Sequence, residues 1–119
     1  AYSMTFNVSG KKLNAILNQR SQDMLAANCW NVCQYAALVC MFAQVSGLEP
    51  GELVHVIADA HIYDRHVPIV EELISREPYD APDFVMDKSI TDFYDFTRDS
   101  FSLENYKFHE FNEKIPVAI

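Results

Sequence analysis

The sequence predicts an α+β fold in which a sheet packs against a long buried helix. Residues 32–46 are apolar almost all the way round, which is typical of a helix enclosed by the rest of the protein. Strand-like runs lie before and after this segment, and an amphipathic, helix-like run follows at residues 67–76. At 119 residues the chain is long enough to bury one core, so residues 1–119 are interpreted as part of a single domain.

The chain begins with a predicted β-hairpin. Residues 3–8 are strand-like, and residues 9–11 have the glycine and polar side chains of a tight turn. Residues 13–19 alternate in part between apolar and polar side chains, which predicts the returning strand. Residues 19–28 have no clear period and are expected to form a loop.

The long helix is expected to begin at Asn31, a good N-cap, and to end at Gly47. Residues 53–58 form a continuous apolar run, which suits a strand covered on both faces. Residues 67–76 predict a second helix with one apolar side. That side consists of Val67, Val70, Leu73 and Ile74.

The pattern weakens after Pro78. Residues 84–86 predict a short strand, and residues 90–96 an aromatic-rich turn or short helix. Residues 101–103 predict a further short strand. No internal repeat or low-complexity segment interrupts this order.

Charge and hydropathy exclude two classes of partner. The net charge is −8, from 17 acidic and 9 basic residues, whereas non-specific DNA binding needs a dense basic surface. The most apolar run, residues 32–45, is interrupted by Gln34 and Gln44 and is shorter than the roughly 20 residues that span a bilayer. We therefore expect no DNA and no membrane among the partners.

The cysteines argue for a reducing compartment. Cys29, Cys33 and Cys40 lie close together on one segment, and an odd count there does not suit a disulfide framework. A zinc site would need further ligands at a recognisable spacing, and the nearest histidine is His55. We expect free thiols packed in or near a core, no bound metal and a cytoplasmic location.

Six short motifs follow one another along the chain. They are Gln19-Arg20-Ser21 with Asp23, then Asn31, Gly47-Leu48-Glu49-Pro50-Gly51-Glu52, Asp59-x-His61-x-Tyr63, Ser75-Arg76-Glu77-Pro78 and Pro116-Val117-Ala118-Ile119. In this order and near this spacing they resemble the C-terminal part of the thymidylate synthases. The resemblance implies a mixed sheet on a buried helix, in an enzyme that methylates deoxyuridylate (dUMP) to thymidylate (dTMP). It also implies 5,10-methylenetetrahydrofolate as carbon donor and reductant, and a homodimer built sheet on sheet.

The resemblance assigns nucleotide-binding roles to the first motifs. Arg20 can fork onto a phosphate, and Ser21 can add a hydroxyl donor, with Gln22 and Asp23 completing this dUMP-binding segment. The Asn31 amide offers the donor and acceptor that complement uracil O4 and N3–H. A plain helix N-cap is the alternative for Asn31, and the two roles can coexist.

The later motifs are assigned to the sugar and the folate. His61 and Tyr63 lie two apart on an extended segment, so both can face the deoxyribose hydroxyl, with Asp59 in support. Asp23 is also expected to anchor the folate's pterin ring, and Ala118 belongs to a tail that covers the bound folate. His55 carries no assignment and is interpreted as structural.

The sequence also departs from the family pattern. No residue matches the family's nucleophilic Pro-Cys, which would align immediately before Ala1, in an upstream part of the same polypeptide. The 119 residues alone are therefore predicted to be inactive. The family's glycines are lost within residues 26–31 and at Ile57-Ala58, where added Cβ atoms can crowd a ligand.

Two other functions remain open from the sequence. One is a pyrimidine-nucleotide hydroxymethyltransferase of the same fold. The other is a non-catalytic nucleotide-binding or assembly module.

Overall fold

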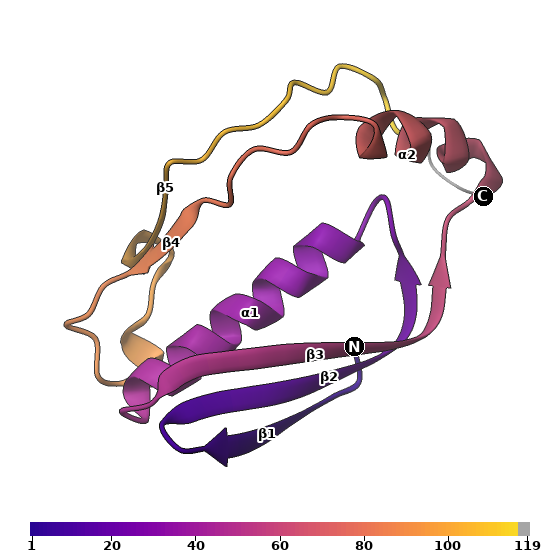
Figure 1. Cartoon of the computed structure of the whole chain (residues 1–119). Coiled ribbons are helices and arrows are strands. Elements are labelled where there is room, and N and C mark those ends of the chain that lie inside the picture. The colour runs from indigo at the N-terminus through magenta and orange to yellow at the C-terminus, as the bar shows by residue number, and fades with distance from the viewer. Residues whose placement is uncertain (117–119) are drawn as a thin grey trace. The chain divides into compact units, whose positions relative to one another are not determined.

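The computed structural model describes residues 1–116, and the chain divides into two compact units, Ala1–Tyr63 and Asp64–Ile119 (Figure 1). The elements of the first unit are β1 (Ser3–Ser9), β2 (Lys12–Asp23), α1 (Asn28–Val45) and β3 (Glu49–His61). Among the described residues of the second unit the elements are η1 (Asp64–His66), α2 (Val67–Ile74), β4 (Asp83–Met86), η2 (Phe93–Asp95), η3 (Arg98–Ser100) and β5 (Phe101–Glu104).

The first unit is a mixed sheet with the order β1-β2-β3. β1 and β2 form the predicted antiparallel hairpin, in which Gly10 takes a left-handed φ of 60° in the turn. β2 and β3 run parallel, and α1 connects them in sequence (Figure 1). The predicted α+β class, with a mixed sheet on a long helix, is confirmed.

β2 is longer than the sequence indicates. The expected loop from residue 19 to 28 is wrong for its first half, because β2 continues through Asp23. Its added residues pair with the distant strand β3, from Gln19 beside Ile57 to Asp23 beside His61. A short turn then occupies residues 24–27.

α1 begins at Asn28, so the prediction that Asn31 caps the helix is wrong. Asn31 lies in the first turn, where its backbone N–H donates to the carbonyl of Ala27 at 3.1 Å. The helix ends at Val45 with Ser46 as its C-cap, and Gly47 follows in the expected left-handed conformation, with a φ of 66°. The N–H groups of Gly47 and Leu48 donate to the carbonyls of Gln44 and Ala43, which is a Schellman arrangement.

The core of the first unit lies between α1 and one face of the sheet. Leu13, Ala15 and Leu17 of β2 are buried, as are Val39 and Ala43 of α1. On the edge strand β1, Phe6 meets Phe42 of α1 edge to face, with ring centroids 5.4 Å apart.

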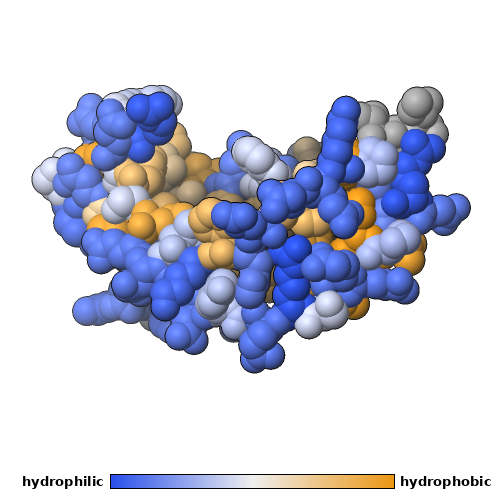
Figure 2. Space-filling model, turned by 90° about the horizontal axis from the view of Figure 1, so that it is seen from above, coloured by the Kyte–Doolittle hydropathy of each residue, from blue (hydrophilic) through white to orange (hydrophobic). Residues whose placement is uncertain are grey.

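The other face of β3 is open within this chain. Val54 is 49% exposed and Val56 is 47% exposed, so the expectation of a strand covered on both faces is not met here. On neighbouring β2, Ile16 is 45% exposed. Figure 2 shows the molecule from above, and on the face in view hydrophobic residues also lie between hydrophilic ones.

The cysteines also differ from expectation. No disulfide joins the cysteines within residues 1–116, but Cys29 and Cys33 are exposed and Cys40 is half-buried. The idea that they are packed in the core is therefore wrong for the first two. No helix within residues 1–116 is both long and apolar enough to cross a membrane.

The second unit confirms the short strands and corrects the helix. β4 pairs antiparallel with β5, and η2 lies in the aromatic-rich turn. α2 stops at Ile74 and buries Ile69, which the predicted apolar side did not include. Val67 and Ile74, which that side did include, are 40% and 76% exposed.

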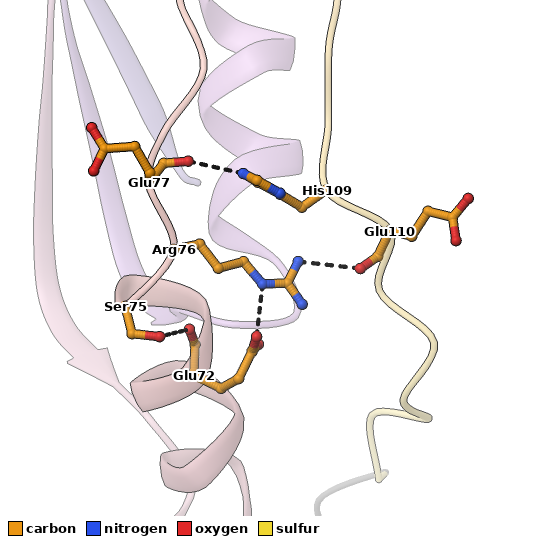
Figure 3. A network of polar contacts seen from close by, with 6 residues as sticks. All are labelled: Glu72, Ser75, Arg76, Glu77, His109 and Glu110. Carbon is orange, nitrogen blue, oxygen red and sulfur yellow. Dashed lines mark hydrogen bonds and ion pairs between the residues drawn. The ribbon is translucent and has the colours of Figure 1, made fainter.

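Hydrogen bonds of Arg76 connect α2 to the segment that follows β5 (Figure 3). Its Nε donates to Glu72 Oε1 at 2.8 Å, and its Nη1 donates to the carbonyl of Glu110 at 3.3 Å. The guanidinium also lies 5.7 Å from the centre of the Phe111 ring. Close by, His109 Nε2 is 2.8 Å from the carbonyl of Glu77.

Replacing Arg76 with methionine is expected to lower the free energy of unfolding by about 1–2 kcal/mol. Methionine keeps the aliphatic stem but removes the ion pair to Glu72 and the bond to the Glu110 carbonyl. Urea denaturation of the protein that carries this sequence measures the change. Arg98→Met is the matched control, because the Arg98 side chain is 96% exposed. Equal stabilities of the two variants would contradict the assigned role of Arg76.

Candidate functional site

Residues from two separate motifs meet where the parallel strands β2 and β3 end. Ser21 pairs with Asp59, and Asp23 pairs with His61. The pairing extends one residue further, because the N–H of Met24 donates to the carbonyl of His61 at 3.0 Å. The structure therefore brings the Gln19–Asp23 segment and the Asp59–Tyr63 segment side by side.

Arg20 and Ser21 are both exposed on β2. Together with Ala1 and Tyr2 they line an open hollow of about 490 Å³. A guanidinium that offers two parallel N–H donors, next to a hydroxyl, is a combination suited to a phosphate or carboxylate. The arrangement can hold an anionic group at the surface of the sheet.

The side chain of Asn31 reaches from α1 to the sheet. Its Oδ1 accepts a hydrogen bond from Gln19 Nε2 at 3.2 Å. The same nitrogen donates to the carbonyl of Ser21 at 2.9 Å. Because Asn31 does not cap the helix, its amide is held by β2 instead, with Oδ1 as an acceptor and Nδ2 as a donor.

His61 and Tyr63 lie together at the end of β3, as the motif predicts. Their rings meet edge to face with centroids 5.1 Å apart. His61 Nδ1 lies 3.3 Å from the carbonyl of Asp59 and 3.6 Å from Asp59 Oδ2. Since a carbonyl can only accept, Nδ1 carries the proton in this contact, which leaves Nε2 as an acceptor for a hydroxyl when the ring is neutral.

Asp23 organises the turn between β2 and α1. Its Oδ1 accepts hydrogen bonds from the N–H groups of Leu25 and Ala26, both at 3.0 Å. These bonds fix the carboxylate and leave Oδ2 as a further acceptor. Gln22, by contrast, is only 1% exposed, and its Nε2 donates to the carbonyl of Asp23 at 3.3 Å.

The sequence assigns no individual role to two residues of this region, Gln19 and His55. Gln19 is 5% exposed on the face of β2 that also buries Leu17, and it contacts both Asn31 and His55. A polar side chain at an inward position of a strand is the signal that points to such a contact, since buried amides need partners.

Ala118 lies outside the described residues. Within residues 1–116, no group of three acidic, histidine or cysteine side chains is placed to hold a metal ion.

Comparisons with known proteins give one family. The sequence model of the family described as thymidylate synthase matches residues 1–119. A thymidylate synthase of Clostridium beijerinckii is 45% identical over 116 residues, which cover 96% of this chain and 44% of that protein. Thymidylate synthase 1 of Bacillus subtilis is 42% identical over 106 residues, or 89% of this chain and 38% of that protein.

A solved structure agrees in fold. The thermostable thymidylate synthase A from Bacillus subtilis superimposes with a TM-score of 0.88 at 38% sequence identity, covering 98% of this chain and 41% of that chain. The chain thus spans less than half the length of the relatives it matches.

Proposed function

This chain belongs to the thymidylate synthase family, and from that premise we propose that the protein carrying it methylates dUMP to dTMP. In this proposal the chain supplies residues that bind the nucleotide and the folate. The observation that carries it is the pairing of Ser21 with Asp59 and of Asp23 with His61, which gathers the motif residues at one end of two strands.

The nucleotide would lie across this strand end. Arg20 and Ser21 would bind the phosphate, since both are exposed in the hollow beside β2. The Asn31 amide would read uracil, with Nδ2 donating to O4 and Oδ1 accepting from N3–H. His61 Nε2 and the Tyr63 hydroxyl would hold the deoxyribose hydroxyl.

The folate would bind next to the nucleotide. Asp23 fits this role, because its Oδ1 is fixed by Leu25 and Ala26 while Oδ2 is available to accept from ring N–H groups. Methylenetetrahydrofolate, when bound, supplies the one-carbon unit and the reducing electrons. The residues of this chain would position the pterin against the pyrimidine, and Ala118 is proposed as part of a covering tail.

A homodimer is part of the same proposal. The open face of the sheet carries exposed apolar side chains on two adjacent strands, Ile16 on β2 and Val54 and Val56 on β3. Apolar side chains on a sheet face favour association with a second sheet. A second copy of the chain is the partner we propose for that face.

The protein is expected to bind dUMP more tightly than deoxycytidylate, and the Arg20→Ala variant is expected to weaken dUMP binding by about 1.5–3 kcal/mol. That range applies to a hydrogen bond with a charged group. Isothermal titration calorimetry measures both quantities. Lys11→Ala is the control, because Lys11 is exposed in the turn before β2, away from Arg20 along the strand, and its loss changes the charge equally. Equal affinity for the two nucleotides counts against the proposed function. If Arg20→Ala leaves the affinity for dUMP unchanged, Arg20 does not bind the phosphate.

A further inference from the structure

Three polar side chains form a hydrogen-bond chain within the first unit. His55 Nε2 lies 3.0 Å from Gln19 Oε1. Gln19 Nε2 in turn lies 3.2 Å from Asn31 Oδ1. Gln19 is 5% exposed, and both His55 and Asn31 are half-buried. These hydrogen bonds link β3, β2 and α1 through the buried amide of Gln19.

The direction of these hydrogen bonds is fixed by a backbone group. Gln19 Nε2 also donates to the carbonyl of Ser21 at 2.9 Å. A backbone carbonyl can only accept, so the NH₂ end of the Gln19 amide must face Ser21 and Asn31. Gln19 Oε1 then faces His55, and His55 Nε2 must carry a proton to donate to it.

Reversing the hydrogen-bond chain is costly because it breaks the bond from Gln19 Nε2 to the carbonyl of Ser21. If Asn31 turned its NH₂ toward Gln19, two donors would face each other, and Gln19 would have to turn as well. A turned Gln19 would set its own carbonyl against the carbonyl of Ser21. It would also require His55 to move its proton from Nε2 to Nδ1. Buried polar groups left without a partner cost more than an ordinary hydrogen bond contributes.

This matters for the choice of base. Uracil presents an acceptor at O4 and a donor at N3, whereas neutral cytosine presents a donor at N4 and an acceptor at N3. In the proposed pose, Nδ2 donates to O4 and Oδ1 accepts from N3–H while it also accepts from Gln19 Nε2, so this sense of the Asn31 amide matches uracil. Reading cytosine requires the opposite sense of the Asn31 amide, and hence the reversal of the whole hydrogen-bond chain.

We infer that His55 is a positioning residue that holds the Asn31 amide, through Gln19, in the orientation that selects uracil over cytosine. The inference rests on the proposed function, because it takes Asn31 as the group that reads the base. His55 touches no substrate in this account. Its effect is confined to the preference between two bases, which separates it from a general role in packing.

The test measures dissociation constants for dUMP and deoxycytidylate by calorimetry in the protein that carries this sequence. His55→Phe keeps a ring of similar size but removes the donor. It is expected to lower the preference for dUMP by about three- to tenfold, the factor that corresponds to one ordinary hydrogen bond. His55→Gln places an amide donor where Nε2 lies and is expected to restore most of the preference. Leu53→Val is the packing control, since Leu53 is half-buried two positions earlier on the same face of β3.

The outcomes separate the inference from the proposed function. If the unaltered protein does not prefer dUMP, the proposed function fails. If it prefers dUMP but His55→Phe leaves the ratio of dissociation constants unchanged, or lowers both affinities alike without rescue by His55→Gln, the inference is overturned. A measurement without substitution adds a second test. Nitrogen-15 NMR of the neutral His55 ring is expected to find the proton on Nε2, and a proton on Nδ1 alone would also overturn the inference.

Discussion

Replacing Asn31 with aspartate is expected to lower the preference for dUMP over deoxycytidylate by about 10- to 100-fold. An ionised carboxylate accepts but cannot donate, so it repels uracil O4 and attracts the amino group of cytosine. The factor corresponds to one hydrogen bond with a charged group, about 1.5–3 kcal/mol. The bond from Gln19 Nε2 is retained, because that nitrogen donates to the position of Oδ1 in both residues.

Helix stability is not expected to cause this change. Asn31 lies in the first turn of α1, where a negative charge is favourable next to the helix dipole. Asn28→Asp is the matched control, since it makes the same substitution at the first residue of the same helix. The control should leave the preference unaltered. If Asn31→Asp also leaves it unaltered, Asn31 does not read the base.

The sequence predicts the elements of this fold well where side-chain pattern and packing agree. The hairpin of β1 and β2 follows from alternation and a glycine turn. The long helix follows from its continuous apolar surface, and Gly47 marks its end through a left-handed backbone. In each case the information lies within a few neighbouring residues.

The errors have two causes, a distant strand partner and a local turn. Residues 20–23 are polar and carry no strand pattern, yet β3 pairs with them and extends β2. The helix starts early because Asp23 organises the preceding turn, with its carbonyl accepting from Ala27 and its Oδ1 from Leu25. Asp and Asn both favour turns and caps of this kind, so the sequence alone does not choose between Asp23 and Asn31 as the residue that precedes the helix.

In the candidate site, the sequence predicts single residues better than the contacts between them. Ordered motifs were enough to name Arg20, Asn31 and His61, because the chemistry of each side chain suits its proposed ligand. The contacts between them were not predictable. The link from His55 through Gln19 to Asn31 joins three elements, and only the fold brings those elements together.

The position of the thiols bears on whether the 119 residues can act alone. The methyl transfer proposed here needs a thiolate that adds to the pyrimidine ring. If Asn31 faces the base, the helix sets the direction of every cysteine in the chain. At about 100° per residue, Cys29, Cys33 and Cys40 project some 160–180° away from Asn31 on α1. All three therefore lie on the wrong side of the helix to reach the bound base.

We accordingly expect the 119 residues by themselves to form no measurable thymidylate. The assay is tritium release from 5-tritiated dUMP in the presence of methylenetetrahydrofolate. In the protein that carries this sequence, Cys29→Ser and Cys33→Ser are expected to change release by no more than about twofold, because both side chains are exposed. Robust release by the isolated residues, or its loss in either serine variant, would identify a nucleophile on α1 and show that the base does not lie where Asn31 faces.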